Sequence, residues 1–378
     1  MKPKTNIEEI TEDQFRSSLL QKAAQQRVPG QAMIELTYGC NLRCVHCYNP
    51  THKAKGELAT EQVYGIIDQL AEEGCLYLGF TGGELFTRRD CFEIFAYAKD
   101  KGFTITLLSN ATLLTPATAD RIQALKPGSV EISIYGARRE TYESVTRIPG
   151  SFERFLRGVQ LLREREVRLL IKMPVMTLNQ HEVQQAKSMV EGWGVRFVYC
   201  TEIFPRVDGL LEPLEYRIAP QDVVRIDDEL MGSQRWRAEG GGEKEENCRT
   251  HPGLFTCKCG RSSATVTPYG EMNLCTALPI PKYDLRMGTV REGWRTLVEL
   301  VDGANVNPGQ AYECPSCNLQ GHCRQGPMNA YLETGDLSPC LPYFKELAGL
   351  EKQACEEATG KQGPGTTGCI KRSPSVID

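Results

Sequence analysis

Residues 39–48 read Gly-Cys-Asn-Leu-Arg-Cys-Val-His-Cys-Tyr and place Cys40, Cys44 and Cys47 at C-x3-C-x2-C spacing. The run directly follows an apolar segment, and no fourth cysteine lies nearby. Three thiolates this close can hold one corner of a cubane iron–sulfur cluster, which four protein thiolates would saturate. With only three, one iron stays open for another ligand, as in a catalytic metal site. The run therefore predicts a catalytic centre, and the alternatives are a zinc knuckle or three reduced core thiols.

Apolar strand-like runs alternate with helical patterns from Gln31 to about Val198. The expected strands are Met33–Thr37, Leu76–Thr81, Thr104–Leu108, Val130–Ile134, Leu169–Met173 and Arg196–Tyr199. The expected helices are Thr60–Glu73, Cys91–Lys101, Pro116–Leu125, Ser151–Arg165 and His181–Glu191, with Thr60 as an N-cap. Six β/α units in series predict an α/β fold whose parallel sheet curls into a barrel or part of one. The cysteine run follows the first strand, so it lies at the carboxyl-end face, where parallel barrels carry their chemistry.

The composition limits the class of protein. The chain has 378 residues, enough for two or three domains, and its net charge of −4 argues against a nucleic-acid partner. The N-terminus has no apolar core of a signal peptide, and no run of about 18 apolar residues predicts a membrane span. We therefore expect a cytoplasmic protein. In that reducing compartment, clustering among 16 cysteines indicates metal binding more often than disulfides.

Composition also divides the chain into segments. Residues 1–30 are expected to form a polar extension and residues 31–230 the barrel. Residues 231–345 begin with a charged, glycine-rich linker at 238–247 and continue as a cysteine-rich domain with few helical patterns. Such a loop-rich domain needs metal or cross-links to stay folded. Residues 346–378 are expected to be a disordered tail.

A second motif lies at the end of the second expected strand, Thr81-Gly82-Gly83-Glu84. Two glycines let the backbone pass close to a ligand, and the carboxylate beside them can receive an ammonium group. A plain turn is the alternative. Beside the cysteine run, this motif resembles the GGE motif of the radical S-adenosylmethionine (SAM) enzymes, which have a partial (β/α)6 barrel. Most relatives have proline after the glutamate, where this chain has Leu85.

The resemblance implies a [4Fe–4S] cluster on Cys40, Cys44 and Cys47, with SAM bound to its open iron. Glu84 would then hold the methionine amine. Reductive cleavage of SAM would give a 5′-deoxyadenosyl radical that abstracts a substrate hydrogen, with the protein shielding it. Further SAM-binding residues implied by the resemblance are His46, Tyr48, Gly82, Gly83, Ser109, Asn110, Ser133 and Arg147. Strand-end capping by Ser and Asn, and a solvated arginine, are the alternatives.

The C-terminal cysteines resemble those of the SPASM domain, an extension that carries auxiliary iron–sulfur clusters. The resemblance implies one cluster on four cysteines that follow C-x2-C-x5-C spacing with a later fourth, Cys314, Cys317, Cys323 and Cys340. Structural zinc is the alternative. A second set is less complete, because Gly326 and Pro327 stand where relatives carry another cysteine. Its candidates are Cys257 and Cys275, with Cys259 and Cys248 as unusual extras.

Enzymes that combine these two domains mostly modify ribosomal peptides or proteins, and the stretch 132–179 looks most like that of peptide maturases. The expected reaction is a thioether or carbon–carbon cross-link, or epimerisation, in a precursor peptide. The expected partners are a flavodoxin or ferredoxin reductant and a separate peptide-recognition protein. Alternatives are a tetrapyrrole-modifying enzyme, a sulfatase-maturing enzyme and a non-catalytic iron–sulfur protein. Sulfatase-maturing relatives place Asp where this chain has Thr276, which counts against that chemistry.

Overall fold

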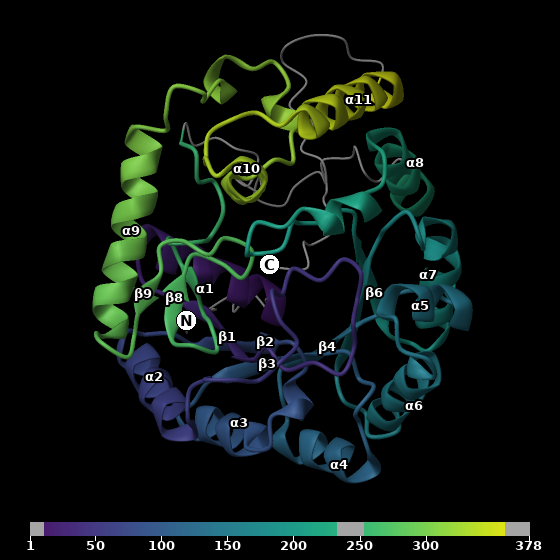
Figure 1. The fold of residues 1–378 in the computed structure, drawn as a ribbon, viewed down its shortest axis with the longest axis vertical. Helices are drawn as coiled ribbons and strands as arrows, with labels where there is room; N and C mark the ends of the chain where they lie inside the picture. The colour runs from purple at the N-terminus through teal and green to yellow at the C-terminus, as the bar shows by residue number, and fades with distance from the viewer. Residues whose placement is uncertain (1–10, 233–252, 360–378) are drawn as a thin grey trace, which may run out of the picture.

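The computed structural model describes residues 11–232 and 253–359 (Figure 1). Within these ranges, nine strands form one sheet in the order β6-β5-β4-β3-β2-β1-β7-β8-β9. Strands β1 to β6 pair in parallel, which confirms the predicted parallel sheet. The strands are β1 Gln31–Thr37, β2 Tyr77–Gly82, β3 Thr104–Ser109, β4 Ser129–Ser133, β5 Leu169–Pro174, β6 Arg196–Cys200, β7 Ser263–Val266, β8 Glu271–Asn273 and β9 Tyr283–Asp284.

Helices α2 to α7 form an arc around the outside of the parallel strands (Figure 1). The helices are α1 Glu12–Gln26, α2 Thr60–Glu72, α3 Cys91–Asp100, α4 Pro116–Leu125, α5 Arg139–Thr146, α6 Ser151–Arg163, α7 Val183–Gly192, α8 Pro220–Met231, α9 Val290–Val306, α10 Pro327–Thr334 and α11 Pro342–Thr359. The predicted N-cap of α2 was wrong by one residue. Ala59 is the cap, and Thr60 is the first helical residue, whose hydroxyl donates to Asp90. None of the helices in the described ranges is both long and apolar enough to cross a membrane.

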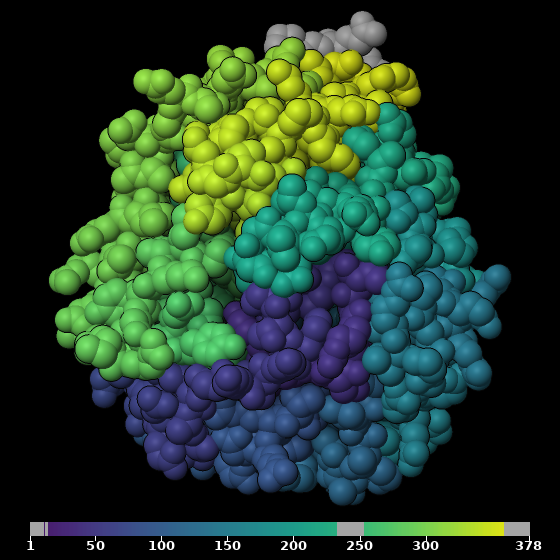
Figure 2. All heavy atoms as spheres, in the orientation of Figure 1, coloured from purple at the N-terminus to yellow at the C-terminus, as the bar shows by residue number. Residues whose placement is uncertain are grey.

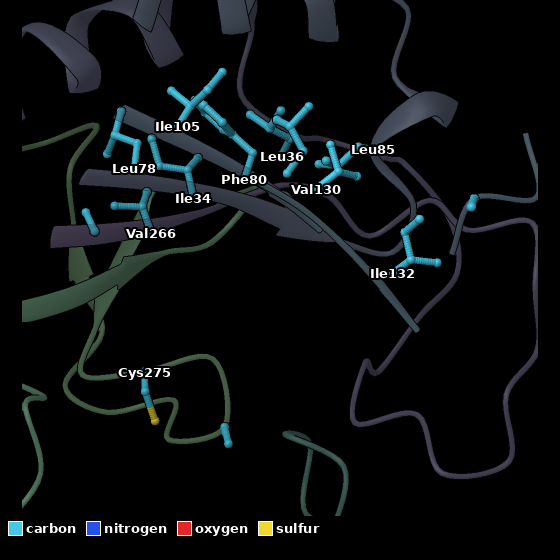
Figure 3. Close-up of a cluster of buried hydrophobic side chains, with 14 of the residues drawn as sticks. Ile34, Leu36, Leu78, Phe80, Leu85, Ile105, Val130, Ile132, Val266 and Cys275 are labelled. Atoms are coloured by element: carbon cyan, nitrogen blue, oxygen red, sulfur yellow. The ribbon is translucent and has the colours of Figure 1, made fainter. Parts of the chain in front are cut away.

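The core lies between the sheet and these helices because alternate residues of each strand point outward. Ile34 on β1, Phe80 on β2, Ile105 on β3 and Val130 on β4 are at most 2% exposed. Figure 3 shows these side chains together on one side of the strands. The intervening residues point into the barrel, so the same strands supply both the core and the walls of an interior cavity.

The C-terminal segment continues the barrel sheet instead of forming a sheet of its own. Strand β7 pairs in parallel with β1, and β8 and β9 extend the sheet in antiparallel fashion. Helix α9 returns along α2, where the side chain of Arg291 pairs with Glu73 at 2.7 Å. The region between 248 and 345, predicted to have few helical patterns, contains α9 of 17 residues and the shorter α10. The predicted linker at 238–247 lies outside the described residues.

The structure differs from the predicted disordered tail over residues 346–359, which belong to α11 and pack against α8. Polar composition concealed a helix whose inner face is buried. Glu351 is 0% exposed and pairs with Arg324, which also pairs with Asp227 of α8. A buried arginine shared by two carboxylates ties the C-terminal helix to the barrel. Residues 360–378 lie outside the described residues.

Gly158 in α6 should be intolerant of a side chain. A Cβ there would lie 2.1 Å from the carbonyl oxygen of Ala111, a residue held at φ 61° just after β3. Gly158→Ala should lower the free energy of unfolding by about 1–3 kcal/mol, the usual cost of overpacking. Gly65→Ala is the matched control, because nothing lies within 4 Å of its Cβ. It should raise stability by about 0.5–1 kcal/mol through helix propensity. Urea unfolding of the two variants side by side checks this, and equal stabilities would contradict the close approach.

Candidate active site

A cavity of about 290 Å³ occupies the barrel interior beneath the cysteine loop, residues 39–52. The molecular surface is hollowed between the purple N-terminal part of the chain and the teal segment that follows β6 (Figure 2). Most of the residues that the sequence analysis assigns to the catalytic centre and to SAM line this one cavity. They are Cys40, Cys44, His46, Cys47, Tyr48, Gly82, Gly83, Ser109, Asn110 and Ser133.

The two glycines after β2 are required by the chain's own backbone. A Cβ on Gly82, whose φ is +133°, would lie 2.2 Å from the carbonyl oxygen of Thr37. A Cβ on Gly83 would lie 2.3 Å from that of Gly39. The backbone N–H groups of Gly83 and Glu84 donate to these same carbonyls at 2.7 and 2.9 Å. The glycines therefore pin the start of the cysteine loop against the end of β2.

The three cysteines of the loop are buried thiols that would ionise only with a cation beside them. Burial raises the pKa of Cys40 to about 11 and raises those of Cys44 and Cys47, and the neighbouring thiols raise the pKa of Cys44 further. Three thiolates side by side are stable only when a metal neutralises them. No group of three or more His, Cys, Asp and Glu in the described ranges converges to hold a single metal ion. A cubane places each thiolate on a different iron, so its ligands need not converge on one point.

Three polar atoms of the cysteine loop are buried without a hydrogen-bond partner, which is uncommon in folded proteins. They are Nδ1 of His46, Oδ1 of Asn49 and Nδ1 of His52, and all three residues line the cavity. Burial lowers the pKa of His46 to about 4, so its ring is neutral. Unsatisfied polar atoms around three thiols are what a polar ligand would satisfy. Asn49 and His52 were not predicted, because neither residue belongs to a motif.

Glu84 does not line the cavity. It is 1% exposed, and its carboxylate accepts hydrogen bonds from the Ser109 hydroxyl at 2.8 Å and the Asn110 N–H at 2.7 Å. Burial raises its pKa to about 7. The carboxylate thus ties the GGE segment to the end of β3. Glu84 therefore holds in place Ser109 and Asn110, two other residues that were predicted to contact SAM.

A ring of side-chain hydrogen bonds joins the end of β3 to the cysteine loop. The Asn110 amide donates to Asn41 at 3.0 Å, the Asn41 amide donates to Thr112 at 2.7 Å, and the Thr112 hydroxyl returns to Asn110 at 2.6 Å. Asn41 directly follows Cys40. The ring therefore fixes the first cysteine relative to the strand end.

A second buried carboxylate, Glu35 on β1, lies behind the loop. It is 1% exposed and accepts hydrogen bonds from the hydroxyls of Tyr48 at 3.1 Å and Tyr38 at 3.2 Å. Burial raises its pKa to about 7, although both tyrosine hydrogen bonds act in the opposite direction. Tyr48 therefore does two things: it lines the cavity beside Cys47 and it anchors the end of the loop to β1.

Arg147 lies apart from the other predicted SAM residues. It is exposed at the C-terminal end of α5 with φ 58°, and it is not among the residues that line the cavity. The sequence pattern could not show this, because the position depends on α5, a helix that the sequence analysis did not predict. Its buried side chains, Thr141, Tyr142, Val145 and Thr146, include too few strongly apolar residues to give a clear helical period.

The four C-terminal cysteines predicted to bind one auxiliary cluster come together. Cys314, Cys317, Cys323 and Cys340 all line a second, smaller cavity. A 3-10 turn at Cys314–Ser316 begins at the first cysteine and ends just before the second, and the Cys317 N–H donates to the Cys314 carbonyl at 3.1 Å. The structure thus brings the four predicted cysteines to one cavity.

The cysteines of the second, less complete set do not all lie together. Cys259 and Cys275 line the barrel cavity, next to Thr276, whereas Cys257 is exposed and lines neither cavity. Cys248 lies outside the described residues. Strand pairing explains the placement, since β7 adjoins β1 and carries the neighbouring segments to the cavity wall. This wall of the cavity comes from the C-terminal region.

The pKa of Glu35 makes stability depend on pH. Folding favours its uncharged form, so its contribution is complete below the ordinary pKa of 4.5 and is lost as pH rises through about 7. The loss amounts to at most about 3 kcal/mol, at 1.36 kcal/mol per pH unit. Glu35→Gln should flatten this decline, and Glu61→Gln, at an exposed position of α2, should keep it. Urea unfolding of metal-free protein from pH 4 to 8 is the measurement. Parallel curves for Glu35→Gln and the wild type would contradict the assignment.

Comparison with known proteins agrees with this geometry. Residues 34–190 match the model of the Radical SAM superfamily. The AdoMet-dependent heme synthase of Methanosarcina barkeri is 28% identical over 82% of this chain and 94% of its own length. The mycofactocin maturase MftC of Mycobacterium tuberculosis is 26% identical over 80% of this chain and 78% of its own. The fold resembles that of Streptococcus suis SuiB bound to its precursor peptide SuiA, with a TM-score of 0.68, 14% identity, and coverage of 91% of this chain and 84% of that one. Residues 34–190 therefore form a radical SAM domain, and the chain is related both to peptide maturases and to AdoMet-dependent haem synthases.

Proposed function

We propose that this enzyme modifies a ribosomally made precursor peptide by forming a thioether or carbon–carbon cross-link, or by epimerisation. The observation that carries the proposal is the single cavity shared by Cys40, Cys44 and Cys47 and the strand-end residues Ser109 and Ser133. Maturases such as MftC, and the maturase-like stretch at 132–179, support a peptide substrate.

The three cysteines would hold a [4Fe–4S] cluster and the strand ends would hold SAM; together these supply a 5′-deoxyadenosyl radical when bound. The chain's own residues position the cofactors and shield the radical. Gly82 and Gly83 keep the loop close to β2, and the Glu84 carboxylate holds Ser109 and Asn110. Glu84 remains the proposed partner of the methionine ammonium, which it would reach only by turning out of its present buried position. The neutral His46 ring is proposed to face the adenine. Orphaned polar atoms at Asn49 and His52 are further candidate contacts.

We also propose an auxiliary iron–sulfur cluster on Cys314, Cys317, Cys323 and Cys340, supported by their common cavity. The incomplete set at Cys259 and Cys275 faces the barrel cavity, where a substrate would lie. A flavodoxin or ferredoxin is the proposed reductant, and a separate recognition protein the proposed carrier of the peptide.

Modification of a tetrapyrrole is the second candidate. The alignment with the haem synthase favours it, because that match extends over 94% of the relative's length and so beyond the barrel. Formation of formylglycine in a sulfatase is disfavoured. Thr276 lies on the cavity wall beside Cys275 and provides no carboxylate base there.

Two reciprocal sets of variants test the metal assignment. The triple variant Cys40→Ala, Cys44→Ala, Cys47→Ala should lose SAM cleavage and about four irons, one cubane's worth, and retain the remainder. The quadruple Cys-to-Ala variant at 314, 317, 323 and 340 should lose a similar number while the catalytic cluster persists. Iron analysis after anaerobic reconstitution and chromatography of 5′-deoxyadenosine provide the readouts. Retained 5′-deoxyadenosine formation in the triple variant, or zinc in place of iron at the second set, would refute the corresponding assignment.

The substrate is tested by offering three compounds with SAM and a reductant. They are the precursor peptide encoded at the same locus, iron coproporphyrin III, and a sulfatase-type peptide with a C-x-P-x-R sequence. We expect a change only in the precursor peptide: loss of two hydrogens for a cross-link, or solvent deuterium at an α-carbon for epimerisation. Mass spectrometry distinguishes the outcomes. Turnover of the porphyrin alone would reassign the enzyme to tetrapyrrole chemistry, and formylglycine in the third compound would reassign it to sulfatase maturation.

A further inference from the structure

Two opposite charges lie inside the barrel, below the predicted SAM residues. Lys172 on β5 and Glu131 on β4 both line the cavity, and the lysine Nζ lies 2.6 Å from Oε2 of the glutamate. Their side chains are only 6% and 16% exposed. The interiors of parallel barrels are usually filled with branched apolar side chains, so a charged pair at this place is exceptional.

Stability does not account for the pair. Removing two charges from water costs several kcal/mol per ion, and apolar residues of similar volume often serve a fold equally well. The pair also borders open space, whereas a structural pair would be enclosed by packed side chains. A buried ammonium group exposed only to an interior cavity is therefore a candidate for binding what enters that cavity.

Strand register gives the depth of the ammonium group. Lys172 lies opposite Ser133 in the parallel pairing of β4 and β5, but its side chain reaches Glu131, two residues earlier on β4. Two residues of strand span about 6.6 Å. The Nζ atom therefore points away from the cysteine loop and lies deeper in the barrel than the level of Ser133, where SAM is proposed to bind.

The floor of the cavity carries a further cation. Arg16 of α1 lines the cavity, stacks on the ring of Tyr77 at 4.7 Å and donates to Gln31 at 3.4 Å. Tyr77 and Gln31 are the first residues of β2 and β1, so Arg16 covers the amino-terminal end of the barrel. Of the described residues lining this lower part, two are cationic and one, Glu131, is acidic. The lower cavity thus favours an anion.

We infer that Lys172 binds a carboxylate of the substrate, with Glu131 holding the ammonium group in place. An ammonium group has three N–H donors and can contact more than one carboxylate at a time. The inference rests on the proposed function, and it deepens it by naming the group that the site recognises. Both candidate substrates present that chemistry, a peptide through its side chains and C-terminus and a tetrapyrrole through its propionates.

The test measures the dissociation constants of three variants with reconstituted, full-length enzyme. Lys172→Met removes the cation, Lys172→Met with Glu131→Met replaces the pair by apolar side chains, and Glu131→Gln keeps the cation. Lys99→Met, on the outer helix α3, is the surface control. The probes are the precursor peptide and iron coproporphyrin III, each compared with its amidated or methyl-esterified form, and SAM itself.

We expect both variants lacking Lys172 to bind the carboxylate form of whichever compound the wild type binds at least about tenfold more weakly. They should bind the acid and the neutral form alike, whereas Glu131→Gln and Lys99→Met should still prefer the acid. SAM affinity should remain within about twofold of the wild type, because Nζ of Lys172 lies deeper in the barrel than the level at which SAM is proposed to bind. The compound that responds identifies whether the carboxylate belongs to a peptide or to a tetrapyrrole.

Four results would overturn the inference: wild-type affinity in the double variant, equal binding of acid and neutral forms by the wild type, binding of neither compound, or a loss of SAM affinity in place of substrate affinity. The last would assign Lys172 to the cofactor. Failure of the proposed function is distinguishable, because it appears as absent SAM cleavage or absent product in the wild type, whatever the affinities.

Discussion

The close contact between the glycines after β2 and the first residues of the cysteine loop is the constraint on which the site depends. Carbonyl oxygens of Thr37 and Gly39 occupy the places where Cβ atoms of Gly82 and Gly83 would lie. Both carbonyls also accept hydrogen bonds from the GGE backbone. The loop that carries three thiols is therefore fixed to the second strand before any cofactor binds, which reduces the entropy that binding must overcome.

Buried charge completes this arrangement. Glu35 lies on β1 and Glu84 just after β2, and burial raises the pKa of each to about 7. Both are engaged by hydroxyl or N–H donors, so neither is structurally idle. Two acids and three thiols in one enclosed region favour positively charged ligands, and a cation bound beside them would shift the acids toward their charged forms. Hydrogen bonds therefore organise the site, and bound cofactors would supply the positive charge that the acids and thiols favour.

The sequence predicted the parts of this site that are local along the chain. Apolar runs identified the six parallel strands, and the cysteine spacing and the GGE motif identified the face that carries the chemistry. Glu35, Glu131 and Lys172 were missed because each is one polar residue within a strand pattern, and its significance depends on which way the strand faces. The pairing of β7 with β1 joins segments more than 200 residues apart, and the periodicity of apolar residues cannot predict such a long-range pairing. Helix α11 was missed because its polar composition resembles that of a tail.

The size of the cavity limits how a substrate can bind. The volume of about 290 Å³ is just below the range for small-molecule sites, about 300–1,000 Å³. SAM on the upper wall would take much of this space. A whole macrocycle or a folded peptide would then have to remain at the mouth, and at most a side chain or an appendage would reach Lys172. Selectivity would then reside in two places: the carboxylate or side chain that enters the barrel, and the surface around the entrance that holds the rest of the substrate. An enzyme built this way can retain its interior chemistry while its entrance adapts to different partners, which is consistent with relatives named as a heme synthase and as a mycofactocin maturase.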